Sequence, residues 1–424
     1  MTAHLRHNVA ALGADYAFFV VGLTLASQST LLPAFAAYLG APNVVVGAIP
    51  AVMTLGWFLP SLFAAGHTEA LPRKLPFILR YTVWERVPFA ILALTAFFIA
   101  GPAPVLALVL LLLMLLVTTG VGGVLMPAWM DLIGRVIPVT ARGRFFAFAN
   151  LAASAGGFAG SFAIASILAA VAAPASYGVC FAFATVCMAL SYIALAFVRE
   201  PAAVATAARV TLRAYLSRMP ALLGRDRNLS WYLGARAFAV VGSVGGGFYT
   251  VYALAAWQAP PSQVGVFTTL MTLGQMGANV VLGWLADRHG HRLVIITGLL
   301  ATLAGNVIAL AAPTLGVFGA VFVLMGVHLA AMNVSTLNVL LEFAPAPAEQ
   351  PTYIGLGTTL MAPIAFGAPL AAGLLADALS YSAVFGVATV AAVIAIGVMI
   401  ARVRDPRWSV ATSAIVRDRM ETTT

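Results

Sequence analysis

Long apolar runs, each about the length of a membrane-spanning helix, leave this chain few folds to adopt. A bilayer core about 30 Å thick requires about 20 apolar residues in a helix. Cutting the sequence at prolines, glycines and charged residues yields twelve such runs in two groups of six. An all-α membrane protein with twelve transmembrane helices is therefore predicted. The runs lie near residues 14–39, 44–66, 77–99, 104–136, 145–171 and 176–198, then near 230–256, 263–286, 292–312, 315–341, 352–376 and 381–402.

The composition excludes a water-soluble fold. Hydrophobic residues make up 62% of the chain and charged residues only 8%, against about 25% charged residues in an ordinary soluble domain. The net charge of +9 would suggest a nucleic-acid partner in a soluble protein. Here the basic residues cluster in short segments between apolar runs, which indicates membrane orientation instead. The expected partners are the lipid bilayer and a small molecule, with no nucleic acid.

The distribution of Lys and Arg predicts the orientation of the chain. Positive charge near the ends of membrane spans stays on the cytoplasmic side. The connection at 40–43, the one at 101–103 and the corresponding later connections contain no Lys or Arg. The N-terminus, the alternate connections and the tail hold almost all the basic residues. We therefore expect a multi-pass protein of the cytoplasmic (inner) membrane with both termini cytoplasmic.

A long polar segment at the middle of the chain divides it into two halves. This segment, residues 199–229, is rich in Ala and Arg and is expected to be a cytoplasmic linker. The predicted domains are an N-terminal six-helix bundle at 1–198 and a C-terminal six-helix bundle at 230–402. Residues 403–424 are expected to form a cytoplasmic tail.

The connection after the eighth run carries a charged motif with two glycines. It contains Gly283, Asp287, Arg288, Gly290 and Arg292. Gly283 is expected to allow close helix approach and Gly290 a tight turn, while the charged side chains can pair across a cytoplasmic gate. This loop resembles the signature loop of the major facilitator superfamily.

The resemblance implies two pseudo-symmetric six-helix bundles, with the substrate site between them near mid-membrane. It also implies alternating access, and we expect a monomer. The corresponding loop in the first half is degenerate, with Glu69, Arg73 and Lys74 at the charged positions. A second pair of loops, 136–146 and 343–353, matches at a constant offset of 207. Leu116 stands where the family's proton-coupled drug antiporters carry an arginine, so the subfamily is not assigned.

Charged residues inside predicted spans are costly, so each needs a partner, water or an escape route. Asp15 is expected in the first turn of its helix, as an interfacial cap. Glu85 and Arg86 are adjacent and point about 100° apart, so each is expected to pair with another helix. They form either a structural charge network or a proton-coupling site. Arg236 either reaches the interface or binds an anion in the cavity.

Polar side chains at helical spacing mark a candidate substrate cavity. His328 lies near the middle of its span, where it could titrate, bind substrate or make one interhelix hydrogen bond. Stripes of this kind are also used as contacts between helices. The candidate cavity residues are Gln28, Thr119, Arg236, Tyr249, Thr272, Gln275, Asn279, His328, Met332 and Ser335.

These features favour a secondary transporter over an enzyme. The sequence has no metal-ligand spacing and no nucleotide-binding glycine loop, so neither a metal nor a cofactor is expected. The predicted function is alternating-access transport of a small organic solute across the cytoplasmic membrane, and the solute class considered for efflux is a neutral or amphipathic compound. One alternative is a proton-coupled carrier that uses His328, Glu85 or Asp15. Another is a lipid flippase with the same fold.

Overall fold

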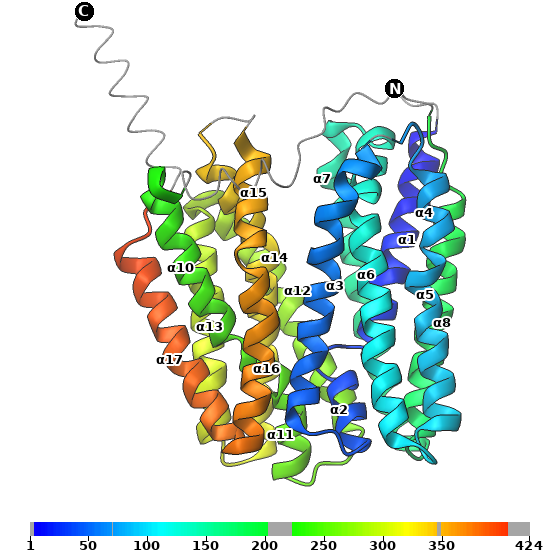
Figure 1. The fold of residues 1–424 in the computed structure, drawn as a ribbon, viewed down its shortest axis with the longest axis vertical. Coiled ribbons are helices and arrows are strands. Elements are labelled where there is room, and N and C mark those ends of the chain that lie inside the picture. Colours follow the sequence, from blue (N-terminus) through cyan, green and yellow to red (C-terminus); the bar gives the residue numbers. More distant parts are fainter. Residues whose placement is uncertain (1–3, 70, 202–222, 346–348, 406–424) are drawn as a thin grey trace, which may run out of the picture. The chain divides into compact units, whose positions relative to one another are not determined.

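The computed structural model describes residues 4–69, 71–201, 223–345 and 349–405, and these ranges are helical almost throughout (Figure 1). Twelve helical spans in the described ranges are long and apolar enough to cross a membrane. Six of them precede residue 201 and six follow residue 223. The predicted all-α class and the two groups of six spans are confirmed.

The helices group into two compact units that do not coincide with the two halves of the sequence. Unit 1 comprises residues 1–212 together with Gly246–Thr272 and Pro369–Ser380. Unit 2 comprises residues 213–245 and 381–424 together with Leu273–Ala368. Three spans of the second half therefore contribute one end to unit 1 and the other end to unit 2.

Unit 1 is built on close helix pairs from the first half of the chain. α3 packs along α6, while α1 packs against both α7 and α8. A Cβ atom added to Gly56 on α3 would overlap Thr119 on α6, so the two backbones touch because glycine has no side chain. The helices are α1 (Leu5–Leu25), α2 (Leu31–Tyr38), α3 (Asn43–Glu69), α4 (Leu75–Tyr81), α5 (Val83–Leu94), the π-helical turn η1 (Thr95–Ile99), α6 (Pro104–Val136), α7 (Val139–Ala170) and α8 (Ala175–Ala196).

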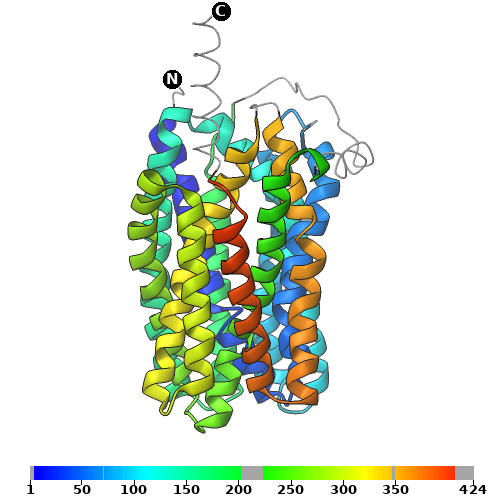
Figure 2. The same ribbon diagram turned by 90° about the vertical axis from the view of Figure 1, so that its left-hand side faces the viewer.

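In unit 2, α17 packs between α10 and α13 (Figure 2). α14 packs along the other side of α13. The core of this unit includes Tyr232, Leu299 and Phe343, all buried. The helices of the second half are α10 (Arg227–Gly242), α11 (Tyr249–Ala256), α12 (Gln263–His289), α13 (His291–Ala311), α14 (Leu315–Phe343), α15 (Gln350–Thr359), α16 (Ala362–Ala378) and α17 (Tyr381–Ala401).

Glycine interrupts the first span of the second half. A short 3₁₀ turn, η2 (Val244–Gly247), separates α10 from α11. Three consecutive glycines at 245–247 weaken the helix at this point, because glycine loses the most backbone entropy on ordering. The boundary between the two units also falls here, between Gly245 and Gly246.

Each half ends in the same four-residue pattern, which the sequence analysis missed. Val-Arg-Glu-Pro occupies 198–201 and Val-Arg-Asp-Pro occupies 403–406. In the first half, the Asn8 side chain exchanges two hydrogen bonds with the backbone of Arg199, at 2.9 and 3.0 Å. In the second half, Asn228 makes the same two bonds with the backbone of Arg404, at 2.9 and 2.8 Å. The first helix of each half is thereby tied to the chain that follows its sixth span.

The acidic residue of this pattern sits at the start of the third span of its half. Glu200 accepts hydrogen bonds from the backbone N–H groups of Lys74 and Leu75, each at 2.9 Å, and so caps α4. Asp405 lies against Gly290, directly before α13. The acidic residue of the pattern therefore lies at the start of the third span in both halves, and in the first half its carboxylate caps the helix.

Candidate functional site

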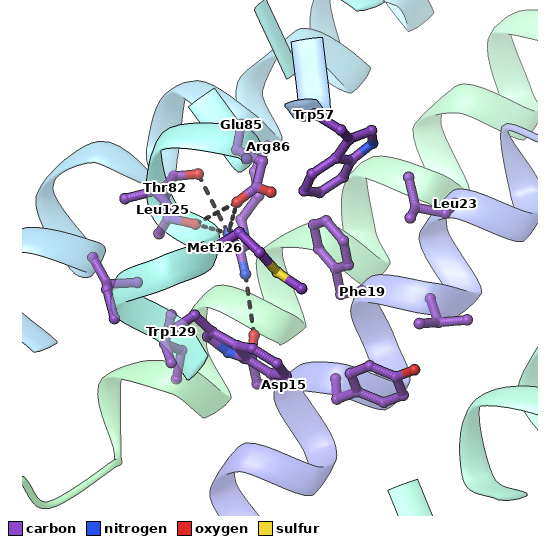
Figure 3. Close-up of a pocket in the computed structure, with 15 residues that line it drawn as sticks. Asp15, Phe19, Leu23, Trp57, Thr82, Glu85, Arg86, Leu125, Met126 and Trp129 are labelled. Carbon is purple, nitrogen blue, oxygen red and sulfur yellow. Dashed lines mark hydrogen bonds and ion pairs between the residues drawn. The ribbon is translucent and has the colours of Figure 1, made fainter. Parts of the chain in front are cut away.

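Two carboxylates and one guanidinium meet inside unit 1 (Figure 3). Arg86 on α5 lies 3.1 Å from Asp15 on α1 and 3.1 Å from its neighbour Glu85. Asp15 is only 3% exposed, and Glu85 and Arg86 are each 7% exposed. The charged residues of the first and third spans therefore form one buried cluster, which we call the charge cluster.

Neutral side chains from α6, α8 and the start of α5 complete the charge cluster. Ser191 on α8 donates to Asp15 Oδ1 at 2.6 Å, and Trp129 on α6 donates to Asp15 Oδ2 at 3.2 Å. The hydroxyl of Thr82 donates to Glu85 Oε2 at 2.8 Å and accepts a hydrogen bond from Arg86. Buried charges persist when they are paired and their remaining positions hydrogen-bonded, and this network meets most of that need.

Both terminal nitrogens of the Arg86 guanidinium are hydrogen-bonded to neighbouring side chains. Its two terminal nitrogens donate to Asp15, Glu85, Ser191 and Thr82. The guanidinium carbon Cζ of Arg86 lies 5.4 Å from the centre of the Phe19 ring, which is a cation–π contact. Nε is buried and has no hydrogen-bond partner among the described residues. Arg86 therefore neutralises carboxylates and leaves little of its charge for a ligand.

A cavity of about 320 Å³ opens beside the charge cluster. Its volume lies at the lower end of the range for small-molecule sites, which is about 300–1,000 Å³. Apart from the charged end, its walls are largely aromatic and aliphatic (Figure 3). The lining residues are Asp15, Tyr16, Phe19, Val20, Leu23, Trp57, Ile78, Thr82, Glu85, Arg86, Gly122, Leu125, Met126, Trp129 and Leu195.

Two expectations for the charged residues were wrong. Asp15 was expected in the first helical turn, but α1 begins at Leu5, so Asp15 lies in the third turn and is buried. Glu85 and Arg86 were expected to point apart. Arg86 does pair with another helix through Asp15, but its long side chain also bends back to Glu85. The spans predicted from apolar runs began near residues 14 and 77, later than the helices at Leu5 and Leu75, so the depth of these charged residues was misjudged.

The predicted cavity residues of unit 1 are not brought to this cavity. Thr119 is buried at the contact between α3 and α6 and donates to Leu115 of its own helix. Tyr249 and Thr272 are also buried, and Thr272 donates to the Thr268 carbonyl. Gln28 is exposed, in the break between α1 and α2.

The predicted polar residues of unit 2 are held mainly by interhelix contacts. His328 Nδ1 lies 2.8 Å from the Thr302 hydroxyl and 3.2 Å from the Gly298 carbonyl oxygen, which fits the interpretation as an interhelix hydrogen bond. Ser335 is buried and lies 3.2 Å from His291 Nδ1. Gln275 and Asn279 are half-buried on α12.

Arg236 and Met332 share a small cavity in unit 2. Arg236 donates to the Gly357 carbonyl at 3.2 Å, so it binds the protein backbone. The cavity has a volume of only about 10 Å³. That volume is about the minimum for a single water molecule. A solute of drug size does not fit there.

The predicted gate residues of the second half lie in the last two turns of α12 and at the start of α13. Gly290 has φ of +88°, which confirms the expected turn glycine. The expected close approach at Gly283 was wrong, because no described atom outside its own helix lies within 4 Å of a Cβ added there. Arg292 donates to the carbonyls of Met399 and Ile400 at the end of α17. The guanidinium of Arg288 lies over the Trp284 ring, with Cζ 4.6 Å from the ring centre.

The remaining gate residues behave differently in the two halves. Lys74 is fully buried, where it donates to the Thr68 carbonyl and lies 3.1 Å from Asp131. Arg73 and Asp287 are exposed. Glu69 ends α3, and its side chain lies outside the described part of the structure.

Comparisons with known proteins agree with the fold. Residues 238–418 match the family model described as the Major Facilitator Superfamily. A crystal structure of a mutant of the nucleoside transporter NupG resembles this chain with a TM-score of 0.72 at 12% identity. The similarity covers 93% of this chain and 99% of that one. This chain therefore resembles the Major Facilitator Superfamily in the sequence of its second half and a transporter of known structure in its fold. No curated protein matches its sequence.

Two further transporters of known structure have a similar fold. A bacterial homologue of the iron transporter ferroportin, in an inward-facing state, matches with a TM-score of 0.70 at 14% identity over 94% of this chain and 99% of that one. A bacterial homologue of the lysosomal transporter Spinster matches with a TM-score of 0.64 at 12% identity over 94% of this chain and 95% of that one. The family match over residues 238–418 and these structural matches support transport across a membrane.

Proposed function

We propose that this protein transports a small amphipathic organic solute and that the cavity beside the charge cluster is part of its binding site. One observation carries the proposal, which is a buried ionic cluster at one end of an otherwise apolar, aromatic cavity. Sites of this kind bind the body of a ligand with apolar walls and fix its orientation with a few polar groups. The proposed direction of transport is export, because the proposed solute is amphipathic.

The distribution of Lys and Arg between the predicted spans supports a membrane orientation. We propose that both termini face the cytoplasm of a bacterial-type inner membrane and that the protein works as a monomer by alternating access. The proposed bundles are 1–198 and 230–402, with 199–229 as linker and 403–424 as tail. Single cysteines introduced at the exposed positions 73 and 287 test this orientation. In sealed vesicles, we expect a reagent on the inside to label them and a reagent on the outside not to.

Proton coupling is a second candidate, supported by the charge balance of the cluster. Two carboxylates share one guanidinium, so the cluster is uncompensated by one negative charge when both are ionised. A net charge inside a membrane is expensive, and one bound proton removes it. His328 is a weaker candidate for this role, because its Nδ1 is occupied by Thr302 and Gly298.

A thermal-shift screen of the purified protein, followed by liposome transport of each hit, tests the solute site. Val20 lines the cavity and is half-buried, so Val20→Phe is expected to fill the cavity and abolish both stabilisation and transport. Gln275→Ala and Asn279→Ala serve as controls on α12 and are expected to leave both unchanged. The opposite pattern would place the solute site in unit 2 and overturn the assignment.

Proton coupling is tested with the same liposomes under an imposed pH gradient. Glu85→Gln keeps the shape of the side chain but removes its charge. It is expected to abolish the dependence of transport on the gradient, whereas His328→Gln is expected to retain it. Wild-type transport that ignores every imposed gradient would exclude this coupling.

A further inference from the structure

The two carboxylates of the charge cluster are satisfied to different degrees. Asp15 accepts hydrogen bonds at both oxygens, from Arg86 and Ser191 at Oδ1 and from Trp129 at Oδ2. Glu85 accepts from Thr82 and Arg86 at Oε2 only. Within the described part of the chain, no hydrogen bond reaches Glu85 Oε1. Oε1 is therefore the carboxylate oxygen of the charge cluster that is available to a proton or a cation.

Glu85 Oε1 is placed next to an aromatic ring at the cavity wall. A Cβ atom added to Gly122 would lie 2.7 Å from Oε1 and 2.7 Å from the Trp57 ring carbon Cη2. The oxygen and the indole edge therefore flank the same glycine. Trp57, Glu85 and Gly122 all line the cavity. Because glycine has no side chain, the carboxylate and the indole can pack side by side against the α6 backbone at the cavity wall.

The surroundings of Glu85 exclude an anion as the favoured occupant. Among the described residues, the other charged groups that line the cavity are Arg86, from the same helix, and Asp15, from α1. Tyr16 on α1 is titratable, but its hydroxyl donates to Asn150 at 2.9 Å. The residues that face Glu85 from α3 and α6 are the uncharged Trp57 and Gly122, and α8 contributes the uncharged Ser191 to the cluster. The N–H groups at both ends of the Arg86 guanidinium are occupied, and the cluster carries a net negative charge when both carboxylates are ionised, so a negative ligand is disfavoured.

We propose that the cavity binds an organic cation with an apolar, aromatic body and that this cation and a proton on Glu85 Oε1 exclude each other. The inference rests on the proposed function and names the substrate class of that site. The cation supplies the positive charge that the cluster lacks. The aromatic rings of Trp57 and Phe19, which line the cavity, add cation–π attraction, and this attraction strengthens when the site is desolvated. The aliphatic lining and Met126 contact the body of the ligand.

Binding of a charged probe and its mirror-charge analogue tests the substrate class. Tetraphenylphosphonium and tetraphenylborate have nearly the same shape and opposite charge. With purified protein in nanodiscs, we expect tetraphenylphosphonium to bind at least tenfold more tightly than tetraphenylborate at pH 8. Equal affinities, or a preference for tetraphenylborate or for neutral triphenylphosphine oxide, would overturn the proposal.

The competition with a proton is tested by the pH dependence. A single competing proton weakens cation binding by up to tenfold for each pH unit below the range where Glu85 ionises. We expect Glu85→Gln to lose at least tenfold in tetraphenylphosphonium affinity and to lose the pH dependence. Glu342→Gln, the same substitution on α14 of unit 2, is the matched control and should bind like wild type. Wild-type binding that does not change between pH 5 and pH 8 would contradict the proposal even if Glu85→Gln fails to fold.

The cavity-filling variant separates this proposal from the proposed function. If Val20→Phe removes the binding of a neutral or anionic probe, the cavity is the solute site and only the substrate class is wrong. If Val20→Phe folds and leaves tetraphenylphosphonium binding unchanged, the cavity is not the site and both proposals fail. Loss of tetraphenylphosphonium binding in Val20→Phe and in Glu85→Gln, with Glu342→Gln unaffected, supports both.

Discussion

At the scale of single residues, the charge cluster shows what a membrane interior demands of ionisable groups. Asp15, Glu85 and Arg86 could be selected from the sequence, because charges in apolar runs are rare and costly. Their mutual contact could not be predicted, because it depends on the rotation of three helices and on where α1 begins. Ser191 and Trp129 carried no signal at all, since buried serine and tryptophan are common in membrane helices.

Removal of Arg86 should destabilise the protein strongly. Arg86→Met leaves Asp15 buried without its cationic partner, and breaking a buried ion pair from one side costs about 3–5 kcal/mol. The triple variant Asp15→Asn, Glu85→Gln, Arg86→Met removes all the charges and should recover most of that loss. Unfolding of the detergent-solubilised protein measures both. A triple variant as unstable as the single one would show that the ion pairs are not what stabilises this region.

Loss of the Ser191 hydroxyl should cost less but still be measurable. Ser191→Ala takes a donor from buried Asp15 Oδ1 and an acceptor from Arg86, and one unsatisfied buried group costs about 1–3 kcal/mol. Thr185→Val on the same helix removes only a hydrogen bond to the Phe181 carbonyl of α8 itself, so it is the control. The difference between their unfolding midpoints is the test. Equal losses would argue against a special role for Ser191.

At the scale of helices, the two glycines of the signature loop have opposite requirements. Gly290 adopts a positive φ and lies against Asp405, so no side chain fits there without strain. Gly283 lies inside α12 with open space beside it. The sequence motif predicted a structural role for both, since it does not distinguish a required glycine from a tolerated one. The contact with Asp405 depends on chain more than 100 residues away and could not be predicted.

Alanine at the two positions should therefore change stability in opposite directions. Gly283→Ala replaces glycine in a helix interior and is expected to stabilise the protein by up to about 1 kcal/mol. Gly290→Ala should destabilise it by about 1 kcal/mol or more, because a non-glycine residue in this conformation is strained. Thermal unfolding of both variants in the same detergent gives the comparison. The same sign of change in both would refute this assignment of roles.

At the scale of the whole molecule, unit 1 contains contacts between helices from both halves of the sequence. The hydroxyls of Thr30 and Thr268 lie 2.7 Å apart, and both residues are fully buried. Asp377 accepts hydrogen bonds from the backbone N–H groups of Asn43 and Val44 at the start of α3. The apolar runs predicted the twelve helices and their order. They could not predict these contacts, because the length and hydrophobicity of a membrane-spanning helix do not determine which other helices it contacts.

Alternating access requires contacts of this kind to separate in each cycle. In a background with Cys180 and Cys187 replaced by Ala, the pair Thr30→Cys and Thr268→Cys should form a disulfide under mild oxidation. Oxidation is expected to stop transport in liposomes and reduction to restore it. Each single cysteine variant is the control and should be insensitive to the oxidant. Full transport by the cross-linked protein would mean that this contact stays closed throughout the cycle.

The charge cluster also constrains how the chain enters the membrane. Asp15 precedes Arg86 by 71 residues, so the ribosome completes α1 long before the partner of its carboxylate is made. A lone aspartate at the centre of a helix costs about 2.5–3.5 kcal/mol on insertion scales. The first helix should therefore be held at the translocon until the third arrives, so that biogenesis of the first three spans is a single concerted event.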